Sequence, residues 1–201
     1  MNNKMKKKLI IYGASGHGKV AADIARLNGY TDIVFFDDDV SKKTFGQYDV
    51  IHSFDGISDY DLFIAIGANQ TREMISKRCD KQLVTLIHPS AVIANDTTIG
   101  QGVIVMANAL INSGSRIGNG TIINTCSSID HDNRIADFCH ISVGAHTAGS
   151  VNIEERVFLG AGSIVINNVS ICKDVTIGAG GVVIHDIKEA GVYVGVPAVK
   201  K

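Results

Sequence analysis

The side chains best suited to chemistry in this chain of 201 residues lie between positions 124 and 146. Asp130, His131 and Asp132 set two carboxylates around one imidazole, and two further histidines follow, His140 and His146. A carboxylate beside a histidine fixes the tautomer of the imidazole and raises its basicity, which suits a general base near neutral pH. His131 is therefore the candidate base. The alternatives are a solvated turn residue for His131 and hydrogen-bonded surface histidines for the other two.

The same segment interrupts a six-residue repeat that runs from Ile87 to Val183. Every sixth residue of this stretch is Ile, Val or Leu, and Thr147 is the one exception. Two residues before each such position stands a small or β-branched residue, and Asn133 is the one exception. Residues i−2 and i lie on the same face of a strand, so each repeat offers one large and one small inward side chain.

A strict six-residue period is typical of a parallel β-helix, in which three repeats make one triangular coil. The alternative, an ordinary β-sandwich, does not hold such a register for about a hundred residues. His140 and His146 each precede an inward position, so they should point outward. His131 and His140 are nine residues apart, which is one and a half repeats, so they should lie on different sides of one prism. We therefore expect a site between subunits.

The beginning of the chain follows the order of a nucleotide-binding βαβ unit. An apolar strand at residues 8–12 leads into the segment 13–18 (GASGHG), and a helix at 19–27 and a strand at 33–36 precede three acids at 37–39. Such a loop exposes N–H groups that bind phosphate at a helix N-terminus, with an acid about 20 residues further on. The glycine spacing is G-x-x-G-x-G rather than G-x-G-x-x-G, so a tight turn without a ligand is the alternative.

Further elements complete this first part. Strands are predicted over residues 61–67 and 83–87, and Asn69 is expected to cap a helix that ends near Arg78. Val20, Ile24 and Leu27 are expected on one face of the first helix, and Met74 and Ile75 of the second helix are expected to face inward. About 85 residues are too few for a full dinucleotide fold, so we expect about four parallel strands that serve one nucleotide.

The sequence thus predicts a truncated Rossmann-like α/β domain over residues 1–86, an all-β parallel β-helix over 87–186 and a C-terminal tail over 187–201. The net charge is −1, and without a sustained basic patch nucleic acid is a poor partner. Residues 1–8 are basic, but the apolar run after them ends at Gly13, too soon for a signal peptide. No apolar run approaches the ~18 residues of a membrane span, so we expect a cytoplasmic protein without a membrane partner.

Six segments together resemble one family of enzymes. They are YGASGHG (12–18), FDD (36–38), IAIG (64–67), NTCS (124–127), HISVG (140–144) and GVPA (195–198). In this order and spacing they are similar to the nucleotide-sugar N-acetyltransferases with a left-handed β-helix, which acetylate the 4-amino group of a UDP- or dTDP-4-amino-4,6-dideoxy sugar, as in bacillosamine synthesis. The similarity extends over nearly the whole chain, and the left hand of the coil is implied by it alone.

The resemblance implies that His131 is the general base and Asp132 its partner. The residues that it implies for the nucleotide sugar are Ser15, Gly16, His17, Asp37, Asp38 and Gly67. Those that it implies for acetyl-CoA are Asn124, His140, Gly149, Ala161 and Ala179. His140 would lie near the thioester, while backbone groups of the glycine and the alanines would line the pantetheine groove. It further implies a homotrimer that binds acetyl-CoA between its prisms, and no metal.

The expected chemistry is direct attack of the sugar amine on the thioester carbonyl, without an acyl-enzyme, with His140 or a backbone N–H stabilising the oxyanion. Three alternatives stay open. One is an O-acetyltransferase of sialic acid or another sugar hydroxyl. A second is a zinc enzyme of the carbonic anhydrase type, with His131, His140 and His146 as ligands across an interface. The third is a non-catalytic scaffold that binds a nucleotide sugar.

Overall fold

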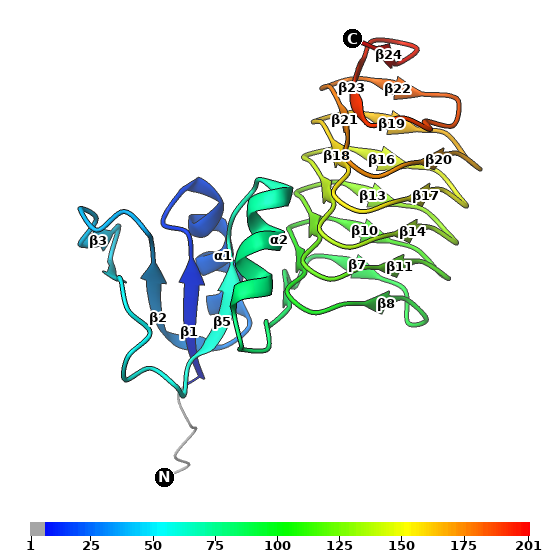
Figure 1. Ribbon diagram of the computed structural model, residues 1–201. Coiled ribbons are helices and arrows are strands. Elements are labelled where there is room, and N and C mark those ends of the chain that lie inside the picture. Colours follow the sequence, from blue (N-terminus) through cyan, green and yellow to red (C-terminus); the bar gives the residue numbers. More distant parts are fainter. Residues whose placement is uncertain (1–6) are drawn as a thin grey trace.

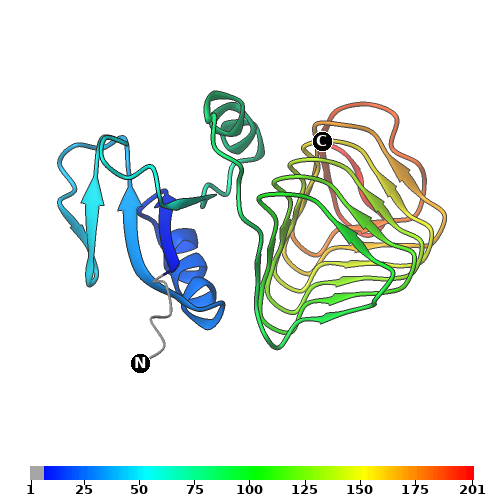
Figure 2. The same cartoon turned by 90° about the horizontal axis from the view of Figure 1, so that it is seen from below.

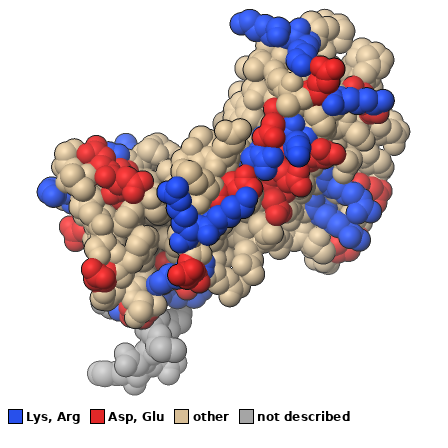
Figure 3. All heavy atoms as spheres, viewed as in Figure 1, with Lys and Arg blue, Asp and Glu red and all other residues tan. Residues whose placement is uncertain are grey.

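A computed structural model describes residues 7–201 of the chain, so the predictions for residues 1–6 concern a segment outside the described residues. An α/β module and a three-sided column of stacked coils lie side by side (Figures 1 and 2). Over the face shown in Figure 3, acidic and basic side chains are interspersed rather than separated by sign. Between residues 7 and 201, no helix combines the length and the apolar character needed to cross a bilayer.

The α/β module is built on a five-stranded sheet with the order β3-β4-β2-β1-β5. Its strands are β1 (Lys7–Tyr12), β2 (Tyr30–Phe36), β3 (Thr44–Phe45), β4 (Tyr48–Ile51) and β5 (Asp61–Ile64). Four of them are parallel, which is the predicted number, and β3 adds an antiparallel hairpin with β4; neither β3 nor β4 is among the predicted strands. The prediction that residues 83–87 form a strand of this sheet is wrong. Only Leu83 bridges to this sheet, while Leu86–Ile87 belongs to the coils.

The first helix, α1 (Gly16–Leu27), begins three residues earlier than predicted. Its buried stripe consists of Ile24 and small residues, chiefly alanines. Val20 and Leu27 are 38% and 56% exposed, so of the three residues predicted to share one face only Ile24 is buried. The helix is enclosed between the sheet and the coils (Figure 2), and alanines allow the close approach that this double contact requires.

The second helix, α2 (Asn69–Arg78), has Ala68 rather than Asn69 at its N-cap, and no side chain caps it. The amide of Asn69 instead donates to the backbone carbonyls of Arg156 and Val157 in the coils. Met74, predicted to face inward, is 44% exposed, whereas Arg72 is 2% exposed. Both corrections have one cause: α2 packs its inner side against the coils, which offer it backbone carbonyls.

The coils consist of three sheets that we name by their end strands, and all their strands pair in parallel except β24, which is antiparallel to β23. The β7–β22 sheet contains β7 (Val92–Ile93), β10 (Leu110–Ile111), β13 (Ser128–Ile129), β16 (His146–Thr147), β19 (Ile164–Val165) and β22 (Val182–Val183). The β8–β20 sheet contains β8 (Thr98–Ile99), β11 (Arg116–Ile117), β14 (Arg134–Ile135), β17 (Asn152–Ile153) and β20 (Ser170–Ile171). The β6–β24 sheet contains β6 (Leu86–Ile87), β9 (Ile104–Val105), β12 (Ile122–Ile123), β15 (His140–Ile141), β18 (Phe158–Leu159), β21 (Val175–Ile177), β23 (Gly191–Val194) and β24 (Val199–Lys200).

Strands of neighbouring coils pair in parallel at a spacing of 18 residues, as in Ile111↔Ile129 and Ile123↔Ile141. The six-residue columns therefore form the inner wall, and these four isoleucines are fully buried. This confirms the β-helix and excludes the β-sandwich. Thr147, the exception in the large column, is also buried, and its hydroxyl has no hydrogen-bond partner among the described residues.

Two of the three corners of the prism carry predicted site residues. We call the turns from the β7–β22 sheet to the β8–β20 sheet the histidine corner, because His131 and Gly149 lie in them. We call the turns from the β6–β24 sheet to the β7–β22 sheet the alanine corner, because Asn124, Ala161 and Ala179 lie in them. Both corners border the β7–β22 sheet.

A shared apolar core fixes the α/β module to the β6–β24 sheet. Leu86, Ile104 and Ile122 point out of the prism and are buried with α1 and the inner face of the module's sheet. The side chain of Asn28, at the C-cap of α1, hydrogen-bonds both backbone groups of Ile87. The carboxyl ends of the module's strands are thereby held close to β15 and β18.

Candidate active site

The predicted nucleotide loop between β1 and α1 contains glycines of two kinds. Gly13 has φ +113°, and a side chain there would meet the carbonyl oxygen of Ala65, while one on Gly18 would meet the carbonyl of Gly13. These two glycines permit the close packing of the loop. Around Gly16 and Gly67, by contrast, no atom lies within 4 Å of where a Cβ would stand. Both border open space at the carboxyl end of the sheet, where such folds bind ligands.

The two predicted acids hold this loop in shape. The carboxylate of Asp37 accepts hydrogen bonds from the backbone N–H of Ala14 (2.9 Å) and from Lys42 Nζ (2.8 Å). Burial acts to raise the pKa of Asp37, but these donors outweigh it and hold the pKa below its ordinary value. Asp38 accepts the hydroxyl of Tyr12 at 2.8 Å. Asp37 is thus ionised and part of the loop's own framework.

The first turn of α1 leads to a pair of histidines at the junction of the two bodies. Ser15 is the N-cap, but its side chain makes no cap hydrogen bond. His17 follows, and across the junction stands His140 on β15. Burial, with the nearby charge of Arg72, lowers the pKa of both imidazoles to about 4. Both rings are therefore neutral at neutral pH, and His140 is enclosed rather than a surface histidine.

The hydrogen bonds of Asn124 fix the tautomer of His140. The side-chain oxygen of Asn124 accepts the backbone N–H of Thr125 at 2.8 Å, so its amide nitrogen must be the group that faces His140 Nε2, at 3.1 Å. Nε2 is therefore an acceptor, and Nδ1 carries the proton. Nδ1 is shielded from solvent and has no partner among the described residues, as is also true of His17 Nε2.

The buried guanidinium of Arg72 links the α/β module to the strand that carries His140. Its acceptors in the coils are the backbone carbonyls of Gly120, Phe138 and Cys139. Its acceptors in the module are the backbone carbonyls of Ile66 and Gly67 and the side chain of Asn69. None of these is a carboxylate. A buried cation tolerates this only when its donors are well satisfied, so Arg72 sets the Gly67 loop against the residues just before His140.

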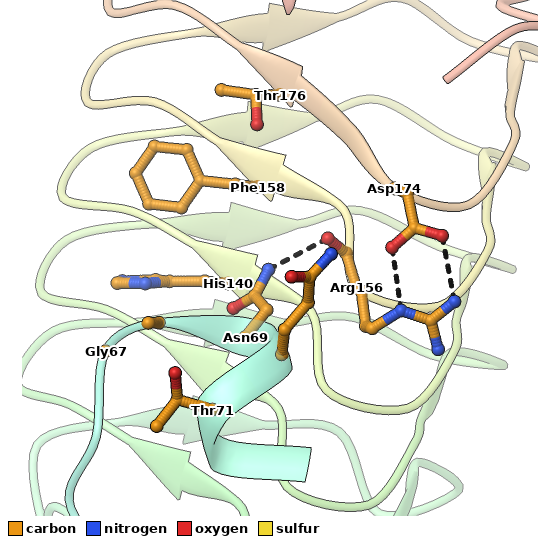
Figure 4. Close-up of a pocket in the computed structure, with 10 residues that line it drawn as sticks. Gly67, Asn69, Thr71, His140, Arg156, Phe158, Asp174 and Thr176 are labelled. Atoms are coloured by element: carbon orange, nitrogen blue, oxygen red, sulfur yellow. Dashed lines mark hydrogen bonds and ion pairs between the residues drawn. The ribbon is translucent and has the colours of Figure 1, made fainter. Parts of the chain in front are cut away.

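A cleft of 590 Å³ opens at this junction (Figure 4). One wall is the start of α2 with Gly67, and the other is the outer face of β15, β18 and β21. His140 and Phe158, stacked on successive coils, meet edge to face with ring centroids 5.0 Å apart. Since α2 has no side-chain cap, the N–H groups of its first turn are free to bind an anionic or carbonyl oxygen.

Charged residues absent from the sequence predictions close one end of the cleft. Arg156 makes a two-pronged ion pair with Asp174 (2.7 and 2.9 Å) and a contact of 3.1 Å with Glu73 of α2. Arg156 and Asp174 are 18 residues apart, and Phe158 is 18 residues beyond His140. The coil register could therefore have identified these neighbours, whereas nothing in the sequence shows that α2 covers them.

His131 lies on the histidine corner, away from this cleft. Its Nδ1 lies 2.8 Å from the carboxylate of Asp132, so Nδ1 donates and Nε2 is left as the acceptor. The side chain is 58% exposed. Asp130 accepts the backbone N–H of His131 and the amide of Asn112, each at 2.8 Å. The hydrogen bond to Asp132 raises the pKa of His131 above its ordinary value.

Gly149 stands one coil above His131, against the Nε2 side of the ring. A side chain at this position would displace the imidazole, so glycine here leaves room for it. Gly149 thus lies beside His131 and Asp132 on the histidine corner, whereas Asn124, Ala161 and Ala179 lie on the alanine corner. The predicted cofactor residues of one chain are divided between two corners.

His146 is exposed on the outer face of the β7–β22 sheet, where Ser128 hydrogen-bonds its Nδ1 at 2.8 Å. One chain does not bring His131, His140 and His146 together. Across residues 7–201, no group of three or more His, Cys, Asp or Glu side chains is arranged to hold a metal ion.

A parallel β-helix with an outward imidazole and carboxylate on one corner, and an α/β module with a glycine loop on one side, is the architecture of a hexapeptide-repeat acyltransferase. Residues 8–79 match the PglD N-terminal domain family. A UDP-N-acetylbacillosamine N-acetyltransferase of Bacillus subtilis is 34% identical over 112 residues, which are 50% of this chain and 52% of that protein. The aligned part thus spans about half the length of that curated relative.

Solved structures match over nearly the whole chain. The acetyltransferase domain of PglB from Neisseria gonorrhoeae is 35% identical, with a TM-score of 0.93 over 98% of this chain and 100% of that one. A perosamine N-acetyltransferase from Caulobacter crescentus, a histidine-to-asparagine mutant in complex with CoA and GDP-perosamine, is 37% identical, with a TM-score of 0.92 over 96% of each chain. This chain belongs to the left-handed β-helix family of nucleotide-sugar N-acetyltransferases.

The two buried histidines predict a loss of stability in acid. Folded, they stay neutral down to about pH 4, whereas in the unfolded chain they bind protons below pH 6.5. The unfolded state then binds more protons, so stability falls as the pH drops from 6.5 toward 4. Each histidine should contribute a loss of roughly 3 kcal/mol over this range. In urea unfolding at pH 7 and pH 4.5, His17→Gln should show a clearly smaller pH dependence than the wild type, and equal dependence would contradict this.

Proposed function

We propose that this protein transfers an acetyl group from acetyl-CoA to the 4-amino group of a UDP- or dTDP-linked 4-amino-4,6-dideoxy sugar. The α/β module would hold the nucleotide sugar, with Gly16 and Gly67 open to it. The relatives support this acceptor class, since one is named for UDP-N-acetylbacillosamine and another binds GDP-perosamine. Acetyl-CoA is supported by a second structure of the Neisseria gonorrhoeae domain in complex with it.

The observation that carries the proposal is the division of site residues between two corners of one prism. His131 and Gly149 lie on the histidine corner, while Ala161 and Ala179 lie on the alanine corner. One acetyl-CoA can contact both sets when the histidine corner of one protomer faces the alanine corner of its neighbour. The neighbour's module, docked beside its own alanine corner, then brings the sugar amine toward His131.

The surface between these corners supports a homotrimer. The outer column of the β7–β22 sheet is Val92, Leu110, Ser128, His146, Ile164 and Val182. Val92 and Ile164 are 62% and 42% exposed. Three prisms that turn these faces toward a common axis would bury this column and form three equivalent sites.

In the reaction, the neutral amine attacks the thioester carbonyl and its proton passes to His131 Nε2 as the N–C bond forms. The negative charge that develops on the carbonyl oxygen would be stabilised by His140 or by a free backbone N–H, such as those at the start of α2. Collapse of the tetrahedral adduct breaks the C–S bond, and the CoA thiolate takes the proton from His131. Holding both substrates across one interface supplies much of the acceleration by orientation.

A thiol-release assay with acetyl-CoA tests the acceptor. We expect turnover with UDP- or dTDP-4-amino-4,6-dideoxy sugars, and a much lower kcat/KM with sialic acid. A preference for sialic acid would identify an O-acetyltransferase instead. Binding of the nucleotide sugar without any thiol release would identify a scaffold.

Replacement of His131 should remove the base. We expect His131→Ala to lower kcat by about 10²–10⁴-fold, with KM little changed. Because the neutral imidazole is the active form and its pKa is raised, wild-type kcat should increase with pH to a midpoint above 6.5 and then level off. Asp132→Asn should move this midpoint to lower pH and lower the plateau by about 10–100-fold. His88→Gln, at the far end of the coils, is the control. Near-normal turnover by His131→Ala would remove His131 from the mechanism.

Mixed trimers test whether neighbouring protomers share a site. Gly16→Trp should block the nucleotide loop without disturbing its packing, because no atom lies within 4 Å of the Cβ position. Gly16→Trp and His131→Ala should each be inactive alone. Co-expressed in equal amounts, they should recover about one quarter of wild-type activity, because a quarter of the sites then pair an intact module with an intact His131. No recovery in verified mixed trimers would mean that each site is built from one chain.

A further inference from the structure

Asn133 is fully buried inside the histidine corner, in a column that otherwise holds small or β-branched residues. Its amide nitrogen lies within hydrogen-bond distance of three backbone carbonyls, those of Asp130 (2.8 Å), His131 (3.2 Å) and Ala148 (2.8 Å). Two of these acceptors belong to the turn that presents His131. Asn133 therefore hydrogen-bonds the backbone of that turn from inside the prism.

Most other polar residues of the inward column donate to the carbonyl of the residue 15 positions further on, in the next coil. The donors are Thr85 to Gly100, Ser115 to Asp130, Thr121 to Ala136 and Cys139 to Glu154. Ser127 instead donates to the carbonyl of Asn124 in its own turn, and the buried hydroxyl of Ser163 has no partner among the described residues. Asn133 thus combines in one side chain the bond to the next coil that Ser115 makes and the bond to its own turn that Ser127 makes.

Ser115, one coil below, supports the same turn. Its hydroxyl donates to the carbonyl of Asp130 at 2.7 Å and accepts the backbone N–H of Asn133 at 3.2 Å. Asp132, between His131 and Asn133, has φ +60°, the left-handed conformation that Cys126 and Ser150 share at equivalent turn positions of the coils. In this turn the carboxylate of Asp132 lies 2.8 Å from His131 Nδ1.

Packing alone does not account for an asparagine at this position. The side-chain oxygen of Asn133 is buried and has no partner among the described residues. A buried polar atom without a partner is unfavourable, and Val151 occupies the equivalent place one coil above without that cost. Departures from a local rule of this kind are most often found where function requires them.

We propose that Asn133 is a positioning residue for His131. It holds the carbonyls of Asp130 and His131 inward, so that Nδ1 stays on Asp132 and Nε2 stays directed at the substrate. Ser115 assists it from the coil below. The proposal deepens the function given above, because it rests on His131 as the general base.

Asn133→Val tests this directly, since valine fills the equivalent place one coil above, at Val151, and can make none of the three hydrogen bonds. We expect kcat to fall about tenfold with KM unchanged. We also expect the pKa of His131, measured by NMR of the ring-labelled protein without substrate, to fall toward 6.5. Asn133→Ala provides a second variant with the same expected direction.

Thr121→Ala is the matched control, because it loses a bond of the same kind, to the carbonyl 15 residues on, at a different corner. It should lower stability but leave kcat and the pKa of His131 unchanged. Wild-type kcat and pKa in Asn133→Val, or equal losses in Thr121→Ala, would overturn the proposal. The NMR measurement needs no turnover, so it remains decisive for positioning even if His131→Ala proves active.

Discussion

The parallel backbone pairing of residues 18 apart is the constraint on which the rest of the structure depends. It turns a linear sequence into three sheets and three corners, so that the location of each side chain follows from its place in the repeat. His131 and Gly149 meet because they differ by one coil, and so do His140 and Phe158. The apolar interior stabilises the column, while the register decides which polar groups become neighbours.

The second determinant is the way in which the module docks. An apolar core holds α1 against the outer face of the first coils, and the Arg72 guanidinium then fixes the Gly67 loop against the β15 strand. This contact encloses His17 and His140 and keeps both uncharged, while the imidazole of His131 stays exposed and more basic. One chain therefore holds histidines of opposite electrostatic character, according to whether the module covers them.

The parts of this molecule that depend on local register could be predicted from the sequence, and those that depend on docking could not. The β-helix, its inward columns and the outward direction of His140 follow from a period of six. The glycine loop and its acids follow from their order. Burial of Arg72 and exposure of Val20 and Met74 do not, because they arise from the surface that the coils present to the helices. Asn133 was visible as an exception, but its three acceptors belong to turns whose shape the sequence does not reveal.

The docking on the lowest coils has a consequence for the geometry of the family. The outward residues that anchor the module, Leu86, Ile104 and Ile122, come from β6, β9 and β12, and His140 stands on the strand directly above. Successive coils rise by about 4.8 Å, so the number of repeats beneath β15 sets the height of His140 and the cleft above the base of the column. A duplication or loss of 18 residues below β12 would shift His140 by one coil, whereas the same change above the cleft would lengthen or shorten the column and leave His140 in place.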